Sequence, residues 1–140
     1  METRLLINHI SRIRDKAHAF LLKQLKEHHM KGIAPTHGDI LWALLSRGEL
    51  SMKDLAESIH RDKSTVTALV NKLVKFGYVK KRTDVNDSRV NLISLTPKGL
   101  ELKDDVMDIS KALREKAYQG LSEKDKKVLM KLLDKIYQNF

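Results

Sequence analysis

The apolar residues between positions 62 and 77 recur three and four places apart. This spacing is typical of a helix buried along one side, and its members are Val66, Leu69, Val70, Leu73 and Val74. Asp62 is placed to accept hydrogen bonds from the free backbone N–H groups of the first turn. Gly77 is placed to end the helix in a left-handed conformation. The pattern therefore predicts one helix between Asp62 and Gly77.

The opposite face of this helix is polar and has no acidic residue after Asp62. It consists of small polar or methyl-bearing side chains edged by lysines, namely Lys63, Ser64, Thr65, Thr67, Ala68, Asn71, Lys72 and Lys75. Short polar groups flanked by cations suit a helix that enters a DNA major groove. Taken alone, the pattern also fits an ordinary amphipathic helix whose polar face meets water. The neighbouring elements favour the first interpretation.

Three helices are predicted before this one. Residues 3–29 carry an apolar stripe made of Leu6, Ile10, Ile13, Ala17, Phe20, Leu21 and Leu25. After a break at 31–35, Thr36 with Asp39 predicts the cap of a second helix that ends at Arg47 and Gly48. The core stripe of this second helix is Ile40, Leu41, Leu44 and Leu45, with Trp42 beside it.

A third, short helix is predicted immediately before the polar-faced one. Ser51 with Asp54 predicts its cap, and its inward side chains are Leu55, Ala56 and Ile59. Residues 60–62 leave only a tight turn before the next helix. Two short helices joined in this way predict a helix-turn-helix.

After Gly77 the apolar pattern changes to that of strands. Residues 78–82 and 90–95 are the candidate strands, and the polar, partly basic segment 83–89 would be the loop of a wing. Thr96 and Pro97 then predict the start of a helix that runs to about Gln119. After Gly120, Ser122 with Asp125 predicts the cap of a last helix. The stripes expected to face inward are Leu102, Val106, Ile109, Leu113 and Ala117, then Val128, Leu129, Leu132, Leu133 and Ile136.

The first helix and the last two helices carry apolar stripes that have no other surface to cover. Mutual packing in a symmetric dimer would cover them. The predicted fold class is mainly α with a small β wing. We expect one domain over 1–140, with a winged helix-turn-helix lobe at 33–97 and helical dimerisation regions at 1–32 and 98–140.

Composition and charge point to an anionic partner. The 140 residues have a formal net charge of +9, which favours nucleic acid or an anionic surface. Residues 63–89 hold seven Lys or Arg and two acids, whereas residues 90–140 hold ten and eight. There is no cysteine, which excludes disulfides and thiol redox sensing. No apolar run approaches the roughly 18 residues of a membrane span, and no signal-peptide pattern is present at the start, so we expect a cytoplasmic location.

Two local strings carry a resemblance to a known family. They are D-K-S-T-V-T-A-L-V-N-K-L-V-K-F-G-Y-V at 62–79 and N-D-S-R-V-N-L-I-S-L-T-P-K-G at 86–99. With the order of elements, they resemble the MarR family of winged-helix transcription regulators over nearly the whole chain. The resemblance implies a homodimer on a pseudo-palindromic operator, with a recognition helix in each major groove and a wing in the adjacent minor groove. Arg89 matches the family's wing-tip arginine, and Asp87 matches the aspartate that orients it.

The expected DNA contacts fall into two groups. Base edges or nearby sugars would be contacted by Ser64, Thr65, Thr67, Ala68 and Asn71, and the minor groove by Arg89. Because this face has no Arg or Gln, we expect an A·T-rich operator. Phosphate contacts are expected from Ser51, Lys63, Lys72, Lys75 and Arg82. The lysines and Arg89 also have an interpretation without DNA. The lysines could be solvated surface charges, and Arg89 with Asp87 could be a weak surface ion pair.

Ligand and metal binding are less strongly indicated. The family commonly binds small aromatic or anionic molecules between the DNA-binding lobe and the helical arms. Met30, Ile33, Trp42 and Tyr118 are the candidates for lining such a crevice, although each also fits plain core. Some members sense zinc, but four ligands cannot be assembled from the histidines, which are His9, His18, His28, His29, His37 and His60. We therefore predict no metal and no cofactor.

The leading functional hypothesis is a dimeric, sequence-specific DNA-binding regulator, a ligand-responsive repressor. The alternative is a protein-interaction module of the same fold that binds another regulator, which the basic wing disfavours. No nucleophile–base pair, glycine-rich phosphate loop or paired carboxylates indicate an enzyme.

Overall fold

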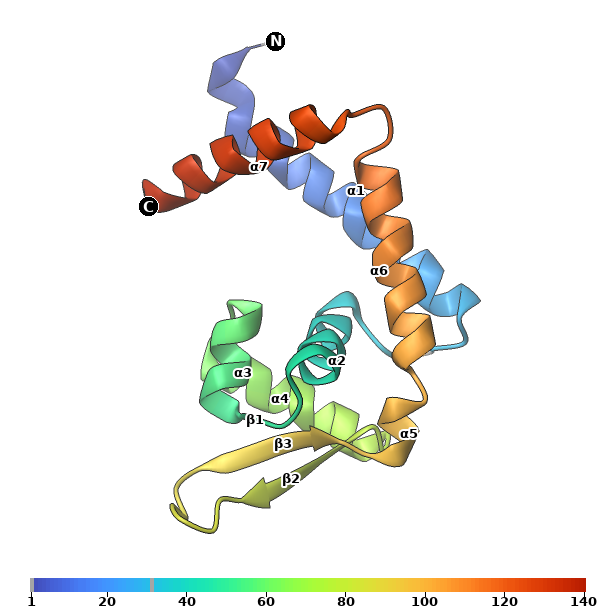
Figure 1. The fold of residues 1–140 in the computed structure, drawn as a ribbon, viewed down its shortest axis with the longest axis vertical. Helices are drawn as coiled ribbons and strands as arrows, with labels where there is room; N and C mark the ends of the chain where they lie inside the picture. Colours follow the sequence, from blue (N-terminus) through green and yellow to red (C-terminus); the bar gives the residue numbers. More distant parts are fainter. Residues whose placement is uncertain (1, 31) are drawn as a thin grey trace.

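The computed structural model describes residues 2–30 and 32–140, and it has a lobe at one end and a group of long helices at the other (Figure 1). A 3-10 turn (Thr3–Leu5) leads into the first helix. The helices are α1 (Leu6–Glu27), α2 (Pro35–Arg47), α3 (Met52–Ile59), α4 (Lys63–Lys75), α5 (Pro97–Leu100), α6 (Lys103–Ala117) and α7 (Glu123–Gln138). The strands are β1 (Leu50–Ser51), β2 (Val79–Thr83) and β3 (Asn91–Leu95).

The predicted wing is part of a three-stranded antiparallel sheet. Its order is β1-β3-β2, so β3 lies between the other two strands. Val79 lies opposite Leu95 and Thr83 opposite Asn91 along the hairpin. On the other edge, Leu50 lies opposite Ile93. The sequence pattern missed β1, because a strand of two residues is too short to show an alternating pattern.

The core of the lobe lies between α2, α3, α4 and the sheet. Its fully buried large side chains are Ile40, Leu41, Leu55, Val66, Val70, Leu73, Val79 and Ile93. Leu25 of α1 and Val106 and Ile109 of α6 join the same core, which attaches the long helices to the lobe. The predicted stripes of α2, α3 and α4 are confirmed except at Val74, which keeps 39% of its surface exposed.

Four of the five predicted helix caps are confirmed. The side chains of Ser51, Asp62, Thr96 and Ser122 each accept a hydrogen bond from the backbone N–H three residues later. The cap predicted at Thr36 is wrong, because the N-cap is Ala34, two residues earlier, and α2 begins at Pro35. Proline needs no N–H partner at a first helical position, and His37 accepts from the Ala34 N–H through Nδ1 at 2.9 Å.

The single helix predicted from Pro97 to Gln119 is also wrong, because it is divided into α5 and α6 at residues 101–102. Thr96 holds α5 on the lobe by donating its hydroxyl hydrogen bond to the carbonyl of Gly77. Gly99 of α5 is buried against the carbonyl of Tyr78. From this anchored turn, α6 runs away from the lobe along α1 (Figure 1).

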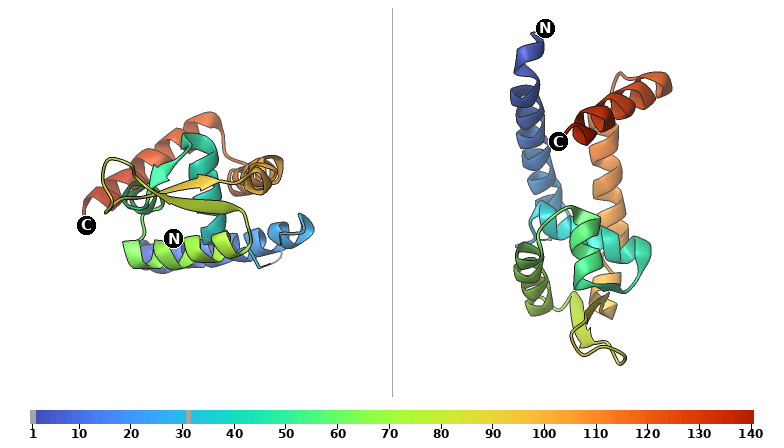
Figure 2. Two further views of the ribbon diagram at one scale, coloured as in Figure 1. Left: turned by 90° about the horizontal axis from the view of Figure 1, so that it is seen from below. Right: turned by 90° about the vertical axis from the view of Figure 1, so that its left-hand side faces the viewer.

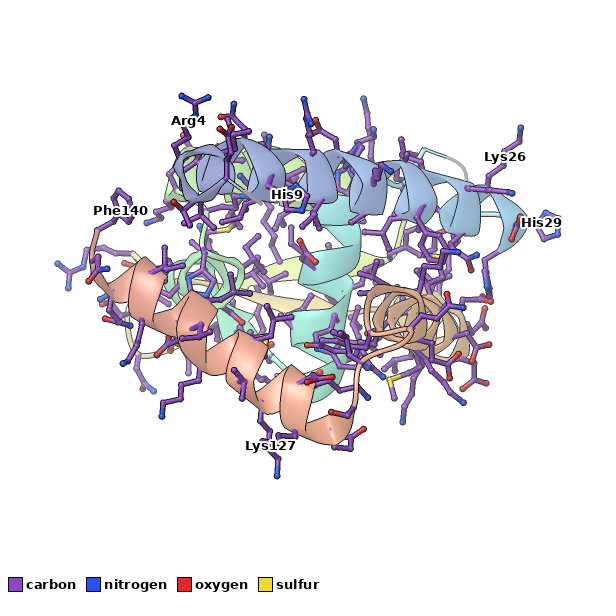
Figure 3. All side chains as sticks on the ribbon, turned by 90° about the horizontal axis from the view of Figure 1, so that it is seen from above. Arg4, His9, Lys26, His29, Lys127 and Phe140 are labelled. Carbon is purple, nitrogen blue, oxygen red and sulfur yellow. The ribbon has the colours of Figure 1, made fainter. Side chains whose placement is uncertain are left out.

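The apolar stripe of α7 does not face inward within the single chain. No residue of α7 is buried, and Val128 and Leu132 keep 47% and 51% of their surface exposed. α1 likewise extends well beyond the lobe (Figure 2). Seen from the α7 end, α1 and α7 are the outermost helices, and Arg4 and Lys127 point outward from them on opposite sides (Figure 3). Across residues 2–30 and 32–140, no helix has both the length and the apolar character to cross a membrane.

Candidate nucleic-acid interface

The N-terminus of α4 is organised by Asp62. One carboxylate oxygen, Oδ1, accepts the backbone N–H of Thr65 at 2.8 Å and the hydroxyl of Ser64 at 2.7 Å. The other, Oδ2, accepts the hydroxyl of Thr65 at 2.9 Å. These hydrogen bonds, that of Ser64 foremost, lower the pKa of Asp62 to about 2. The first turn of α4 is thus fixed by a carboxylate that stays ionised near neutral pH.

This cap determines what the hydroxyl groups of α4 can offer to a ligand. Ser64 and Thr65 already donate to Asp62, and Thr67 donates to the carbonyl of Lys63 at 2.8 Å. A hydroxyl that donates internally can still accept through its oxygen. In this arrangement the three side chains are acceptors, which suits the exocyclic amino groups of adenine or cytosine in a major groove.

The rest of the exposed face of α4 is polar and cationic. Asn71, Lys63, Lys72 and Lys75 are all exposed. Asn71 forms no side-chain hydrogen bond with a described residue, so its amide is available as both donor and acceptor. Lys72 extends along the helix with Nζ 5.9 Å from the centroid of the Phe76 ring. Thr67 is half-buried, unlike the other predicted contact residues of this helix.

The wing presents Arg89 at the loop between β2 and β3. Asp87 accepts from Arg89 three times: from the backbone N–H at 3.0 Å, from Nε at 3.1 Å and from Nη2 at 3.2 Å. The pKa of Asp87 is lowered first by the side-chain hydrogen bond from Arg89 and then by the backbone one. The Arg89 side chain nevertheless keeps 88% of its surface exposed. The pair therefore holds a guanidinium in solvent in a defined orientation, as predicted for this wing.

Figure 2 shows the spatial relationship of the two parts. In the view from below, α4 and the β2–β3 hairpin both lie in the foreground at the end of the molecule opposite α7 (Figure 2, left). The predicted helix contacts and the predicted wing contact thus belong to one end of the molecule.

The side chains predicted to contact phosphate differ in whether they already have a partner within the chain. Arg82 donates to Glu49 from Nη2 at 2.6 Å and from Nε at 3.0 Å, and its hydrogen bond lowers the pKa of Glu49. Ser51 accepts the Asp54 N–H at 3.0 Å, which leaves its hydroxyl proton for another partner. Among the described residues, Lys63, Lys72 and Lys75 form no ion pair.

Three features of this end were missed from the sequence. Glu49 neutralises Arg82 from 33 positions away, a pairing that no local pattern reveals. Val85 is an apolar residue on the wing loop with 88% of its surface exposed. Lys80 and Lys81 are exposed on β2. A count of basic residues along the hairpin could have found these two lysines.

The four residues predicted to line a crevice are not brought together. Met30 and Trp42 line a cavity of about 180 Å³ between α1, α2 and α6. Ile33 is buried in the lobe core and does not line this cavity. Tyr118 lies at the end of α6, where Lys126 Nζ is 5.3 Å from the centroid of its ring. The predicted crevice therefore exists only in part.

The histidines do not converge. His28 Nδ1 lies 2.7 Å from Asp105 Oδ1 and joins the end of α1 to α6. His37 is buried in α2, and its Nε2 has no partner among the described residues. Outside residues 1 and 31, no group of three or more His, Cys, Asp or Glu is arranged to hold a metal ion.

Comparison with known proteins identifies the fold of this interface. The model of the MarR family matches residues 33–90, which run from the start of the lobe to the wing. The lobe resembles the MarR family over these residues. The matched residues include α4 and β2, together with the loop that carries Arg89.

The curated relatives are named as HTH-type transcriptional regulators. The chain is 25% identical over 100 residues to the HTH-type transcriptional repressor IacR of Pseudomonas putida, covering 71% of this chain and 60% of that protein. It is 36% identical over 72 residues to the HTH-type transcriptional regulator SarZ of Staphylococcus saprophyticus, covering 51% and 49%. The chain thus spans about half to three fifths of the length of these two relatives.

Solved structures share the fold over nearly the whole chain. A MarR transcriptional regulator from Methanosarcina mazei superposes with a TM-score of 0.82 at 22% identity, covering 98% of this chain and 96% of that one. A cysteine-to-serine mutant of MarR from E. coli, complexed with operator DNA, gives a TM-score of 0.83 at 19% identity, covering 97% and 99%. The predicted fold class, mainly α with a β wing, is confirmed.

Proposed function

We propose that this chain, which resembles the MarR family, is a sequence-specific DNA-binding transcriptional regulator that acts as a homodimeric repressor. The observation that carries the proposal is the end of the molecule formed by α4 and the hairpin. It presents an exposed polar helix face with unpaired lysines and an ordered arginine, at the place where a MarR recognition helix and wing occur. Cations at these positions would neutralise phosphates, and the polar side chains between them would contact bases.

In the proposed complex, α4 enters a major groove and the wing enters the adjacent minor groove. Asn71 would pair with adenine, and the methyl groups of Thr65 and Ala68 would meet thymine. Arg89, held by Asp87, would occupy a narrow A·T-rich minor groove, where the negative potential is strongest. Ser51, Lys63, Lys72 and Lys75 would contact phosphates. Arg82 would join them only on leaving Glu49.

The proposed dimer uses the helices at the other end of the molecule. Apolar side chains that would otherwise meet water line α1 and α7, among them Ile7, Ile13, Val128, Leu132 and Tyr137. A helix face rich in exposed apolar side chains indicates an interaction site, and a second copy of the same helices is the partner that closed symmetry favours. We assign residues 33–97 to the DNA-binding lobe and residues 1–32 and 98–140 to dimerisation.

Repression and ligand response complete the proposal. One relative is named as a transcriptional repressor, and 6-hydroxynicotinic acid regulates the DNA binding of Bordetella bronchiseptica BpsR, a protein similar in fold. The cavity between α1, α2 and α6 lies where the lobe meets the long helices. A ligand that binds one lobe arrangement better than another would change DNA affinity without contacting DNA.

A gel-shift titration with the DNA upstream of the chain's own gene tests the proposal. We expect a retarded complex whose affinity falls steeply with salt, and a preference for an A·T-rich pseudo-palindrome with half-sites about 10 bp apart. Binding that ignores both salt and base order would overturn it in favour of a protein-interaction role.

The dimer is tested separately by light scattering. The expected mass is twice the 16.1 kDa of one chain. Leu132→Asp changes an exposed side chain of the single chain, so it should yield folded monomers that bind the operator weakly. A wild-type chain of monomeric mass would contradict the dimer.

A further inference from the structure

The cavity between α1, α2 and α6 has the size and lining of a small-molecule site. Its volume is about 180 Å³, and an apolar cavity of about 150 Å³ in another protein, an engineered lysozyme, holds one benzene ring. The walls are largely aliphatic and come from Leu21, Leu25, Val106, Ile109 and Leu113. Trp42 adds an aromatic surface. The space therefore suits one aromatic ring with a short substituent.

The charge in the lining of this cavity is negative. Among the described residues that line it, Asp39 is ionisable, and none is Lys, Arg or His. The Asp39 carboxylate forms no hydrogen bond or ion pair with a described residue, and solvent reaches it. Partial burial raises the pKa of Asp39, and the field of Arg61 opposes this rise. The other polar side chain in the lining is Ser110.

Nearby cations are directed elsewhere. Arg114 donates from Nη1 to the Ser110 oxygen at 2.6 Å, but Arg114 is not part of the lining and itself lines a separate hollow with Glu115 and Tyr118. Arg61 belongs to the turn before α4 and is not part of the lining. His28 and Asp105, at the junction of α1 and α6, are paired with each other. An anionic ligand would thus place its charge beside Asp39 with no cation in the wall.

We propose that this cavity binds a small molecule that combines one aromatic ring with a protonated amine. The ring lies among the aliphatic side chains and Trp42, and the ammonium group pairs with Asp39. This inference rests on the proposed ligand response and names the ligand class. It distinguishes this chain from a regulator whose effector is an aromatic acid, because an acidic group in this cavity would meet the like charge of Asp39 and no cation of the lining.

Fluorescence of Trp42 provides a direct measurement, since it is the single tryptophan of the chain. The chain is titrated at neutral pH with benzylamine, benzyl alcohol and benzoate, which share a ring and differ in charge. We expect benzylamine to bind at least about tenfold more tightly than benzyl alcohol, the usual gain for a hydrogen bond to a charged group. Benzoate should bind most weakly of the three.

Two variants and a pH series assign the selectivity to Asp39. Asp39→Asn should remove the preference for benzylamine and leave the affinity for benzyl alcohol unchanged. Asp108→Asn, an exposed acid of α6 outside the lining, is the matched control and should change nothing. The pH series uses the wild-type chain, so no substitution can disturb the fold. Benzylamine affinity should fall as pH decreases through the pKa of Asp39, while benzyl alcohol affinity stays constant.

Several results would overturn this proposal. They are benzoate binding as tightly as benzylamine, equal benzylamine affinity in Asp39→Asn and wild type, or no saturable change with any of the three probes. The gel shift of the unliganded chain is a separate measurement. Its failure would remove the proposed DNA-binding function while leaving the ligand titration interpretable, so the two failures can be told apart.

Discussion

The guanidinium of Arg82 on β2 donates two hydrogen bonds to the carboxylate of Glu49, the residue before β1, at 2.6 and 3.0 Å. This contact ties the outer strands of the sheet together across β3. It also neutralises a basic side chain at the end of the molecule proposed to meet DNA. Arg82 is therefore paired within the chain and cannot contact a DNA phosphate unless it leaves Glu49.

Replacing Glu49 should release Arg82 toward DNA. For Glu49→Gln we expect higher operator affinity and a plot of log affinity against log salt that is steeper by up to about one unit, since one more phosphate can be neutralised. Fluorescence anisotropy at four or more salt concentrations measures both quantities. Glu115→Gln is the control, because it removes an exposed, ion-paired acid from α6. Equal effects of the two variants would show that only net charge matters.

Lys72 is expected to act on all DNA sequences alike. Its ammonium is unpaired and lies on the exposed face of α4, so Lys72→Ala should weaken specific and non-specific duplexes by the same factor and reduce the salt slope by about one unit. Lys127→Ala, on the outward face of α7 (Figure 3), should leave the slope unchanged. An unaltered slope in Lys72→Ala would exclude a phosphate contact by this residue.

Arg89 should instead affect sequence preference. Because Asp87 fixes the guanidinium in solvent, Arg89→Ala should lose most affinity for operators whose minor groove under the wing is A·T-rich and narrow. Competition between two operators that differ only at the wing position, one A·T and one G·C, measures this. Arg12→Ala on α1 removes the same charge from the other end of the molecule and serves as the control. A loss that is equal for both operators would reduce Arg89 to a phosphate contact.

Local sequence signals predicted the helix boundaries well. Caps at Ser51, Asp62, Thr96 and Ser122 depend on side chains three residues from their partners, so they are visible in any short window. The pairing of Asp87 with Arg89 is equally local, although it is the family resemblance that implies it. The start of α2 was misplaced, because two adjacent signals competed and the proline at position 35 prevailed over the Thr36 cap.

Contacts between residues far apart in the chain could not be predicted from the sequence patterns. The division between α5 and α6 depends on Gly99 meeting the Tyr78 carbonyl, and the fate of Arg82 depends on a glutamate 33 positions away. Tyr118 and Met30 are predicted to line one crevice, yet they line different hollows. Burial periodicity identifies which residues face inward but not which element they meet.

The Asp62 cap predicts a specific pH dependence of stability. Its pKa is about 2 in the folded chain and 3.8 ordinarily, so its contribution is present above about pH 4 and is lost as pH falls toward 2. Asn caps helices about as well as Asp but does not titrate. The stability of the wild type relative to Asp62→Asn should therefore decrease between pH 5 and pH 2. Thermal unfolding of both chains at the two pH values measures it, and a constant difference would contradict the cap's assigned role.

Gly99 should tolerate no side chain. A Cβ built at this position would lie 2.1 Å from the carbonyl oxygen of Tyr78 and 3.1 Å from Cδ2 of Leu95, and the first contact is with backbone that cannot rotate away. Gly99→Ala should destabilise the lobe by at least the 1–3 kcal/mol typical of overpacking, as an order of magnitude. Gly38→Ala is the matched control, because a Cβ there meets nothing within 4 Å and alanine favours the interior of α2 by about 0.5–1 kcal/mol. Urea unfolding of the two variants should therefore shift in opposite directions. A shift in the same direction would mean that α5 can move off Tyr78 at little cost, and that the break between α5 and α6 has another origin.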